Sequence, residues 1–386
     1  MRTAWILLAF PTLCLAGPKP GAEGTPEYKT AADLVRQLGD PKFAVREAAA
    51  KKLVDLGAAA VPALAAGATS ADEEVRTRSA ALLPRAEAVG WARRADAFLA
   101  DPAGHRDLPL VAEWERLAGK PAAGSRRLYA DMLRGGGSVL EAAAADRSAG
   151  AAAVAARARA LLDASRAKGT QVEIPAGAVA AVLFAQAVVR DPTPEPAADG
   201  GRHEPLYLLA NPAVAAALGD KVVGPACRRL VVAWVESRPA DETMSALYFA
   251  LLAIRRPFPG ADPALVRLAT KHRSVQVRWV ALEALGRSGT DAAKAELTGL
   301  LGDKTAMYDN LGNGDAGHQV RDCALAALAG GAGKDPAAYG LTSYMSAGFW
   351  FGGTADTVTV HLRGFKSAAD RDRGLQKWKA EAGGKK

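Results

Sequence analysis

Long apolar runs are scarce in this chain of 386 residues. After the first residues, the longest apolar stretch is Ala178 to Val189, which falls short of the ~18 residues that a membrane-spanning helix needs. We therefore expect no transmembrane segment once a leader has been removed.

Cysteine and histidine are also few. The five histidines are widely separated, without the paired spacing of a metal site. Cys227 and Cys323 lie in apolar helical stretches, where buried free thiols are common, although export would also permit a disulfide between them. We expect no metal and no other cofactor.

Aromatic residues make up only 6% of the chain, whereas alanine supplies much of its 49% hydrophobic content. Alanine has the highest helix propensity and little side-chain volume, so alanine-rich helices can approach each other closely. Together with a mean hydropathy of -0.01, this composition favours a folded and mainly helical protein. At this length we expect either two globular domains or one elongated stack of repeats.

The first residues match an export signal. Arg2 supplies the positive start, Ala4 to Leu15 supply the apolar stretch, and cleavage is expected after Ala16. We predict a signal peptide over residues 1–16 and a tether rich in proline and glycine over residues 17–30. The mature protein should be periplasmic or secreted.

The formal net charge is +8, or +7 without Arg2, which is mildly basic for this length. Arginine pairs recur with acidic residues between them, at Arg93-Arg94, Arg126-Arg127, Arg228-Arg229 and Arg255-Arg256. This scatter favours solvated helix faces over a nucleic-acid site, because no aromatic–basic motif accompanies it. Binding to an anionic envelope surface stays open as an alternative.

An internal repeat is the most informative pattern. In four segments a Val-Arg pair is followed by a leucine eight residues after the valine: Val45-Arg46 with Leu53, Val75-Arg76 with Leu83, Val277-Arg278 with Leu285, and Val320-Arg321 with Leu328. An alanine stands between valine and leucine in each, at Ala49, Ala80, Ala281 and Ala324. These positions fall on one helical stripe, which predicts a narrow buried face of small residues.

Turn-forming residues precede each valine. Asp40 and Asp315 stand six residues before their arginines, and Ser70 and His272 take that place in the other two segments. An Asp or Ser there predicts a cap for the helix N-terminus. The arginine is expected to reach back and pair with a neighbouring turn.

With these turns, the segments resemble HEAT repeats, including the PBS-lyase-like subtype that is common in bacteria. The resemblance covers about 31–90 and 262–332 and is lost between them. It implies an all-α fold, a right-handed α-solenoid of stacked antiparallel helix pairs. It carries over no catalytic residues, because the shared positions are structural.

Between the repeat blocks the chain still has helical periodicity. The predicted helices are 108–117, 128–133, 142–162, 178–189, 222–236 and 246–255, with a break at Gly135-Gly136-Gly137. Four prolines mark 191–205 as a loop or hinge. We divide the mature chain into N-terminal repeats (31–170), a helix (171–190), the hinge, C-terminal repeats (206–335) and a terminal segment (336–386).

The terminal segment differs in kind, because Tyr339 to Trp378 holds seven of the 23 aromatic residues. Thr357 to Leu362 alternates, with Val358, Val360 and Leu362 on one side, which predicts a strand. Asp370 to Lys379 is predicted to be a charged helix that Trp378 docks. We expect the segment to cap the exposed end of the stack, with a ligand site as the alternative.

Motifs for catalysis are weak. Residues 312–317 match Gly-x-Gly-x-x-Gly, but a dinucleotide site needs a strand just before it, and 307–310 is predicted to be no strand. For a calcium site, Leu311 and Val320 occupy positions that need oxygen ligands.

We therefore expect a non-enzymatic scaffold that binds another protein. The alternatives are an envelope component that binds an anionic polymer, and an enzyme of unrecognised type that uses the terminal aromatic segment or the loop 309–318.

Overall fold

Helices make up most of the residues that the computed structural model describes. These residues are 26–101, 103–105, 107–119, 122–166, 174–189, 208–209, 211–239, 242–257, 260–308, 317–350 and 357–383. The predicted signal peptide and the predicted hinge lie outside them. The chain divides into two units, Met1–Asp191 and Pro192–Lys386. None of the described helices combines the length and the apolar character that crossing a bilayer requires.

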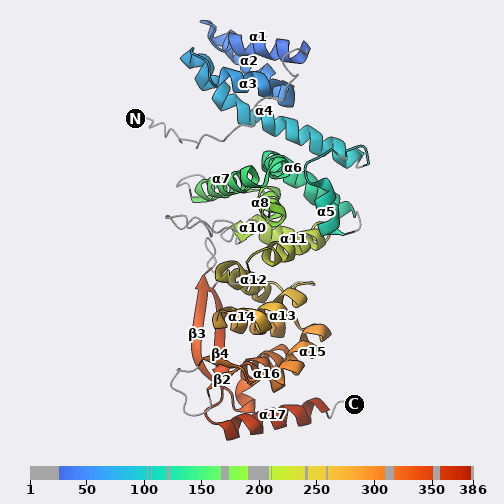
Figure 1. The fold of residues 1–386 in the computed structure, drawn as a ribbon, viewed down its shortest axis with the longest axis vertical. Helices are drawn as coiled ribbons and strands as arrows, with labels where there is room; N and C mark the ends of the chain where they lie inside the picture. The colour runs from blue at the N-terminus through green and yellow to red at the C-terminus, as the bar shows by residue number, and fades with distance from the viewer. Residues whose placement is uncertain are drawn as a thin grey trace. The chain divides into compact units, whose positions relative to one another are not determined.

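The helices of the first unit pack largely in sequence order. Their bounds are α1 (Pro26–Gln37), α2 (Phe43–Leu56), η2 (Gly57–Ala60), α3 (Val61–Gly67), α4 (Glu73–Ala100), α5 (Val111–Ala118), α6 (Ala123–Ala145), α7 (Arg147–Arg166) and α8 (Ala176–Val189). Helix α2 packs against α4, α4 against α6, and α6 against α8 (Figure 1). Leu34, Leu53 and Leu64 belong to one hydrophobic core that α1 to α4 share. Each helix thus buries the apolar stripe that it could not shield alone.

Several helix boundaries differ from the sequence prediction, and two of the differences have a clear local cause. Helix α1 begins at Pro26, inside the predicted tether, because a proline is well suited to the first turn of a helix. The predicted helix 142–162 is interrupted at Asp146, which separates α6 from α7. Asp146 Oδ1 accepts the Ala149 N–H at 2.8 Å and so starts a new helix.

The three glycines at 135–137 bend α6 and do not end it. Gly136 leaves the helical conformation, with φ of -164° and ψ of 31°. The carbonyl oxygen of Gly135 accepts a hydrogen bond from Arg157 Nη2 of α7 at 2.7 Å. A side chain at Gly137 would overlap the ring of Trp91, so glycine also lets α4 and α6 approach.

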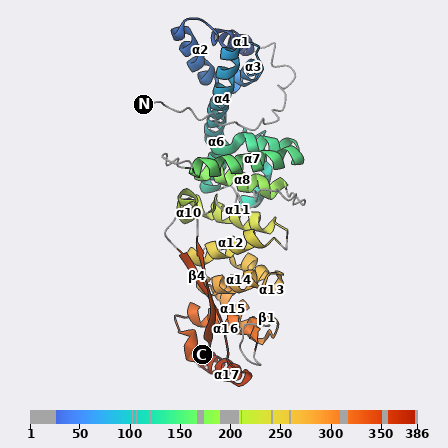
Figure 2. The same ribbon diagram turned by 90° about the vertical axis from the view of Figure 1, so that its left-hand side faces the viewer.

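In the second unit the helices form two layers. Their bounds are α10 (Pro212–Gly219), α11 (Gly224–Glu236), α12 (Thr243–Arg255), α13 (Asp262–Lys271), α14 (Val275–Ser288), α15 (Asp291–Gly299), η4 (Leu300–Gly302) and α16 (Val320–Gly331). Helices α12, α14 and α16 pack consecutively, and α11, α13 and α15 do the same (Figure 1, Figure 2). The contact of α14 with α16 is close, since a Cβ on Gly286 would lie 2.5 Å from the carbonyl oxygen of Ala327.

A short strand pair interrupts this unit before α16. Strand β1 (Ala306–Tyr308) pairs antiparallel with β2 (His318–Gln319). The prediction that 307–310 contains no strand is therefore wrong. A dinucleotide fold would need a parallel strand–helix–strand unit, which this antiparallel pair does not provide. The glycine-rich loop 312–316 and Asp315 lie outside the described residues.

The chain then forms a hairpin, after η6 (Pro336–Tyr339), from β3 (Thr342–Trp350) and β4 (Thr357–Gly364). The predicted strand at 357–362 is confirmed, because Val358, Val360 and Leu362 alternate as buried residues along β4. Strand β4 contacts α12, α14 and α16 (Figure 2). Residues 336–386 are predicted to cap the end of a stack, whereas the apolar face of the hairpin packs along three successive helices.

The last helix, α17 (Ala368–Gly383), packs against α16 and η6. It confirms the predicted helix at 370–379, and its Trp378 ring lies 5.4 Å from the Tyr339 ring, as the predicted docking requires. Arg371, 2% exposed, pairs through Nε with Asp322 Oδ1 at 2.7 Å and through Nη2 with Oδ2 at 2.8 Å. Asp322 is fully buried in the first turn of α16. A buried ion pair therefore joins α17 to α16.

Candidate functional site

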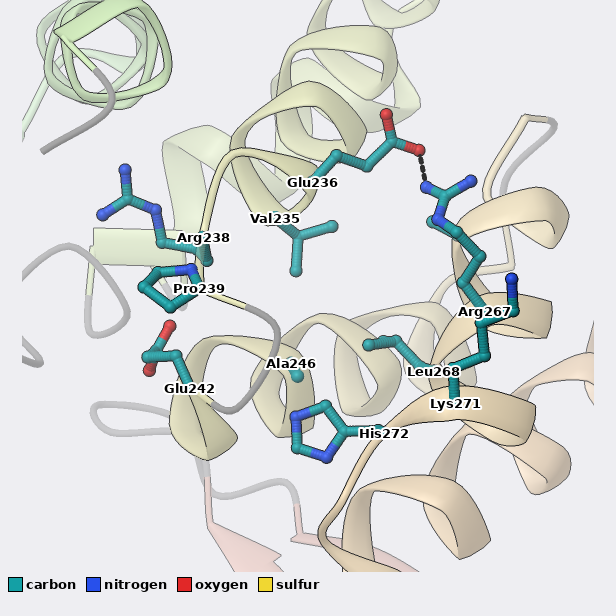
Figure 3. A pocket seen from close by; sticks show the side chains of 11 residues that line it. Val235, Glu236, Arg238, Pro239, Glu242, Ala246, Arg267, Leu268, Lys271 and His272 are labelled. Carbon is teal, nitrogen blue, oxygen red and sulfur yellow. Dashed lines mark hydrogen bonds and ion pairs between the residues drawn. The ribbon is translucent and has the colours of Figure 1, made fainter. Parts of the chain in front are cut away.

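A cavity of about 220 Å³ lies in the second unit, where the end of α11, the start of α12 and the end of α13 meet (Figure 3). Its apolar wall consists of Val235, Pro239, Ala246, Ala264 and Leu268. Its polar lining consists of Glu236, Arg238, Glu242, Arg267, Lys271 and His272. A concavity that combines an apolar wall with polar and charged groups is the kind of place where a small molecule can bind.

The local sequence explains why a cavity opens here. Helix α11 ends at Glu236, where the Ser237 hydroxyl donates to the carbonyl oxygen of Trp234 at 2.7 Å and Pro239 follows. Glu242 then starts α12, with Oε1 accepting the Ser245 N–H at 2.9 Å. The end of α11 and the start of α12 thus form two walls of the cavity, and α13 forms the third.

His272 is the most buried polar group of the cavity, at 6% exposed. It follows directly on α13, and its Nδ1 accepts the Ser274 N–H at 3.0 Å. Its Nε2 is buried and has no hydrogen-bond partner among the described residues. Figure 3 shows the ring extending from the end of α13 towards the side of the cavity where Glu242 lies.

Glu242 supplies the second unpartnered atom. Its Oε2 is buried and accepts no hydrogen bond from the described residues, although Oε1 caps α12. On the opposite side, Arg267 forms an ion pair with Glu236 (Figure 3). Lys271 is exposed at the rim. The lining therefore includes rim charges of both signs and two residues that each have a buried polar atom without a hydrogen-bond partner among the described residues, and both of those atoms are inaccessible from the cavity.

The repeat residues lie elsewhere and are structural. The valines and leucines of the four segments lie on α2, α4, α14 and α16. Val45 is half-buried. The other seven are buried: Val75, Val277, Val320, Leu53, Leu83, Leu285 and Leu328. In the second segment the stripe passes through Ser79, which is fully buried, and not through the predicted Ala80, which is exposed. The stripe holds a residue four positions after the valine, as Ala49 does in the first segment.

The arginines of the first two segments confirm the prediction that they reach back to a turn. Arg46 Nη1 donates to the carbonyl oxygens of Asp40 and Pro41 at 2.8 and 3.2 Å. Arg76 Nη1 donates to those of Ser70 and Ala71 at 2.8 and 3.3 Å. The same geometry thus occurs twice.

The arginines of the other two segments have different hydrogen-bond acceptors. Arg278 Nε donates to the carbonyl oxygen of Ala269 in the last turn of α13, at 3.0 Å. Arg321 Nε donates to Gln319 Oε1 at 2.6 Å. Each still satisfies an acceptor close to its own helix start.

The residue six positions before the arginine does not cap the helix, which corrects the prediction for Asp40 and Ser70. Asp40 Oδ1 accepts the Lys42 N–H at 2.8 Å, and Ser70 Oγ accepts the Asp72 N–H at 3.2 Å. His272 Nδ1 has the same role towards Ser274. The turn therefore requires only an acceptor, which three different side chains provide.

Cys227 and Cys323 are buried free thiols, so the alternative of a disulfide between them is wrong for this structure. Burial raises the pKa of Cys227 to about 12 and also raises the pKa of Cys323. Neither thiol forms a reactive thiolate near neutral pH. Among the described residues, no group of three or more His, Cys, Asp or Glu side chains could hold a metal ion.

Comparison with known proteins gives no relative: no family model, no curated protein and no solved structure matches the chain. The candidate site therefore rests on its own geometry. Sequence reasoning did not single out Glu242, and it noted His272 only as a departure from the Asp of the turn. That departure was the one signal that could have drawn attention to the cavity.

Proposed function

We propose that this chain is an exported, HEAT-like α-solenoid that serves as a binding scaffold for another protein. The observation that supports it best is the serial packing of α12, α14 and α16, with α11, α13 and α15 forming a second layer. Arrays of this kind offer an extended surface to a partner. The repeated turn of Arg46 and Arg76 supports the same interpretation in the first unit.

In this proposal α17 is the cap of the stack. It packs on α16, the last helix of its layer, and its buried Arg371 pairs with Asp322 there. A terminal repeat needs such a cover, because its outer face would otherwise be exposed to water.

The arginine pairs favour a protein partner over an anionic polymer. Arg93 donates to the carbonyl oxygen of Asp55 at the end of α2, at 2.6 Å. Arg228 and Arg256 donate to those of Leu218 and Ala215 in α10, at 2.7 and 3.2 Å. In three of the four pairs, then, one arginine satisfies backbone acceptors of a neighbouring helix. These guanidinium groups support the fold and are less available to a polyanion.

Capture of the mature chain's partner from the native envelope tests the role. We expect a protein in a fixed ratio to the bait, and weaker capture by the variants Phe43→Ser and Val222→Ser, which change apolar residues that are 63% and 51% exposed. Recovery of polysaccharide or lipid alone, with binding that collapses as salt is raised, would contradict it. Export is tested separately, since N-terminal sequencing of the mature protein should begin at Gly17.

A further inference from the structure

The hairpin of β3 and β4 has one covered edge and one open edge. Strand β4 lies between β3 and the helices and contacts α12, α14 and α16 (Figure 1). At the outer edge of β4, the carbonyl oxygen of His361 accepts a hydrogen bond from Trp279 Nε1 of α14 at 3.2 Å. Strand β3 packs chiefly on β4, and among the described residues none outside the hairpin forms a hydrogen bond with the β3 backbone. The outer edge of β3 is therefore open.

Two hydrogen bonds of β4 show which groups of β3 face this edge. The His361 carbonyl points to α14, whereas the Gly364 carbonyl points to β3 and accepts the Thr342 hydroxyl at 3.3 Å. Antiparallel strands alternate between bonded and non-bonded pairs, so Ser346, which stands opposite His361, directs its backbone N–H and C=O away from β4. Gly348 does the same two residues further on, and both residues are exposed.

The open edge also lacks the usual protection. Natural edge strands are protected by charged residues, proline or bulges. Thr342–Trp350 contains no charged residue and no proline. The register shifts between Ser343 and Met345, but from Met345 to Trp350 the pairing is continuous. At about 3.4 Å per residue, this leaves about 20 Å of regular edge on which another strand can pair.

The helix-facing side of β3 is incompletely covered as well. On β4, Val360 and Leu362 are fully buried, but their cross-strand partners Ala347 and Met345 are only half-buried. Residues that stand opposite each other in an antiparallel pair lie on the same side of the sheet. The apolar side of the sheet therefore continues past the helices that cover β4, and a further strand beside β3 would cover it.

We propose that a second copy of this chain binds at this edge, with the two β3 strands antiparallel, so that the two hairpins form one four-stranded sheet. A twofold axis sets β3 against itself. Small residues (Ser346, Ala347 and Gly348) then meet small residues, and no like charges stand opposite each other. The strand of a different protein would be selected through side-chain pockets or charges, and β3 offers no charge. The inference concerns self-association and does not depend on the proposed protein-binding role.

Two substitutions at Ser346 should block this pairing and leave the bonds between β3 and β4 in place. Ser346→Pro removes an outward N–H that β4 does not use, which is where an edge strand tolerates proline. Ser346→Lys puts a positive charge from each copy at the join, in the way that natural edges prevent association.

Two further variants are matched controls. Ser346→Ala removes only the hydrogen bond of the Ser346 hydroxyl with His361 Nδ1 and keeps the backbone as it is. Thr359→Lys adds the same charge on the same exposed face of the hairpin, opposite Gly348, but on β4 and away from the open edge.

The test is sedimentation velocity of the full mature chain from about 1 µM to about 100 µM, with the melting temperature of every variant measured alongside. We expect a dimer for the parent, for Ser346→Ala and for Thr359→Lys. Ser346→Lys should raise the dissociation constant at least about tenfold, and Ser346→Pro should be monomeric throughout. If Ser346→Pro melts below the parent, Ser346→Lys is compared with Ser346→Ala alone.

A parent that stays monomeric, or a dimer that a folded Ser346→Pro or Ser346→Lys variant leaves intact, would overturn the proposal. An equal loss in Ser346→Ala or Thr359→Lys would also overturn it, because the contact would then lie on the exposed face of the sheet. A monomer whose partner capture depends on Ser346 would assign the edge to a strand of another protein. Failed partner capture with an intact dimer would refute only the scaffold.

Discussion

The turns that start α2 and α4 in the first unit differ from those that start α14 and α16 in the second, although all four carry Val-Arg. In the first unit Arg46 and Arg76 bind the carbonyl oxygens of their own turns. In the second, Arg278 reaches the preceding helix and Arg321 binds Gln319. The valine and leucine positions keep their roles because burial selects them. The arginine adapts to whichever carbonyl or amide acceptor the preceding segment brings near.

The two units also differ in the polar side chains that they bury. Among the described residues, the buried polar side chains of the first unit are serines, Ser79 and Ser125. The second unit buries Ser245 together with four titratable or charged groups: His272, His318, Asp322 and Arg371. Regular packing suffices for the first unit, whereas the second contains polar groups with specific partners. Substitutions of these groups test whether the two units depend on different interactions.

The largest effect is expected at the buried ion pair of Arg371 with Asp322, which has no counterpart among the described ion pairs of the first unit. Arg371→Met leaves Asp322 charged and fully buried without its partner, which should lower the free energy of unfolding by about 3–5 kcal/mol in urea denaturation. The control is Arg373→Met in the same helix, whose pair with Asp370 is largely exposed and should change stability by about 0–1 kcal/mol. Equal losses in the two variants would mean that the buried pair is not a special support of this unit.

Close helix contacts should matter equally in both units. Gly286→Ala forces a Cβ against the backbone of α16, and Gly177→Ala forces one against the backbone of α6. Each should lower the free energy of unfolding by about 1–3 kcal/mol.

The matched control is Gly299→Ala, because a Cβ at that helical position meets nothing within 4 Å. It should raise stability by about 0.5–1 kcal/mol. Thermal melting of the three variants checks the pattern, and a stable Gly286→Ala protein would show that α14 and α16 can move apart without loss.

The turn arginines should have smaller effects. Arg46→Ala and Arg76→Ala each remove a charged donor from two backbone oxygens in an accessible turn, with an expected loss of about 1 kcal/mol. Arg46→Lys should not restore the loss, since a single ammonium group lacks the planar guanidinium geometry. If Arg278→Ala lowers the free energy of unfolding by the same amount in chemical denaturation, then Arg278 stabilises its unit as much as Arg46 and Arg76 stabilise theirs, although it binds a different acceptor.

Much of the helical framework could be predicted from local sequence. The Val-Arg stripe, the helix at 178–189 and the strand at 357–362 depend on residues close in the chain, so periodicity reveals them. The stripe was misplaced at Ala80, because alanine and serine both fit a narrow helix contact. The hairpin's place beside α12, α14 and α16 was missed, because long-range packing leaves no local pattern.

The candidate site shows the same limit more sharply. Glu242 and His272 belong to different turns, and only the packing of α11, α12 and α13 brings them to one cavity. A glutamate that caps a helix and a histidine that replaces an aspartate are each unremarkable in sequence. Their unpartnered atoms become visible only when every donor and acceptor around them has been assigned.

The smallest expected change concerns pH and is confined to the second unit. His318 is buried against the Tyr344 ring, 4.6 Å away between centroids. Burial lowers its pKa, with Asp322 acting to raise the pKa and Arg371 to lower it further. The unfolded chain binds a proton below about pH 6.5, while the folded ring resists it. The contribution of His318 to stability is therefore complete above about pH 6.5 and declines as the pH falls towards the folded pKa.

His318→Phe should make the free energy of unfolding less dependent on pH between about pH 7 and pH 5, because phenylalanine keeps the ring contact without titrating. Parallel curves for parent and variant would place the acid sensitivity of this unit at another group.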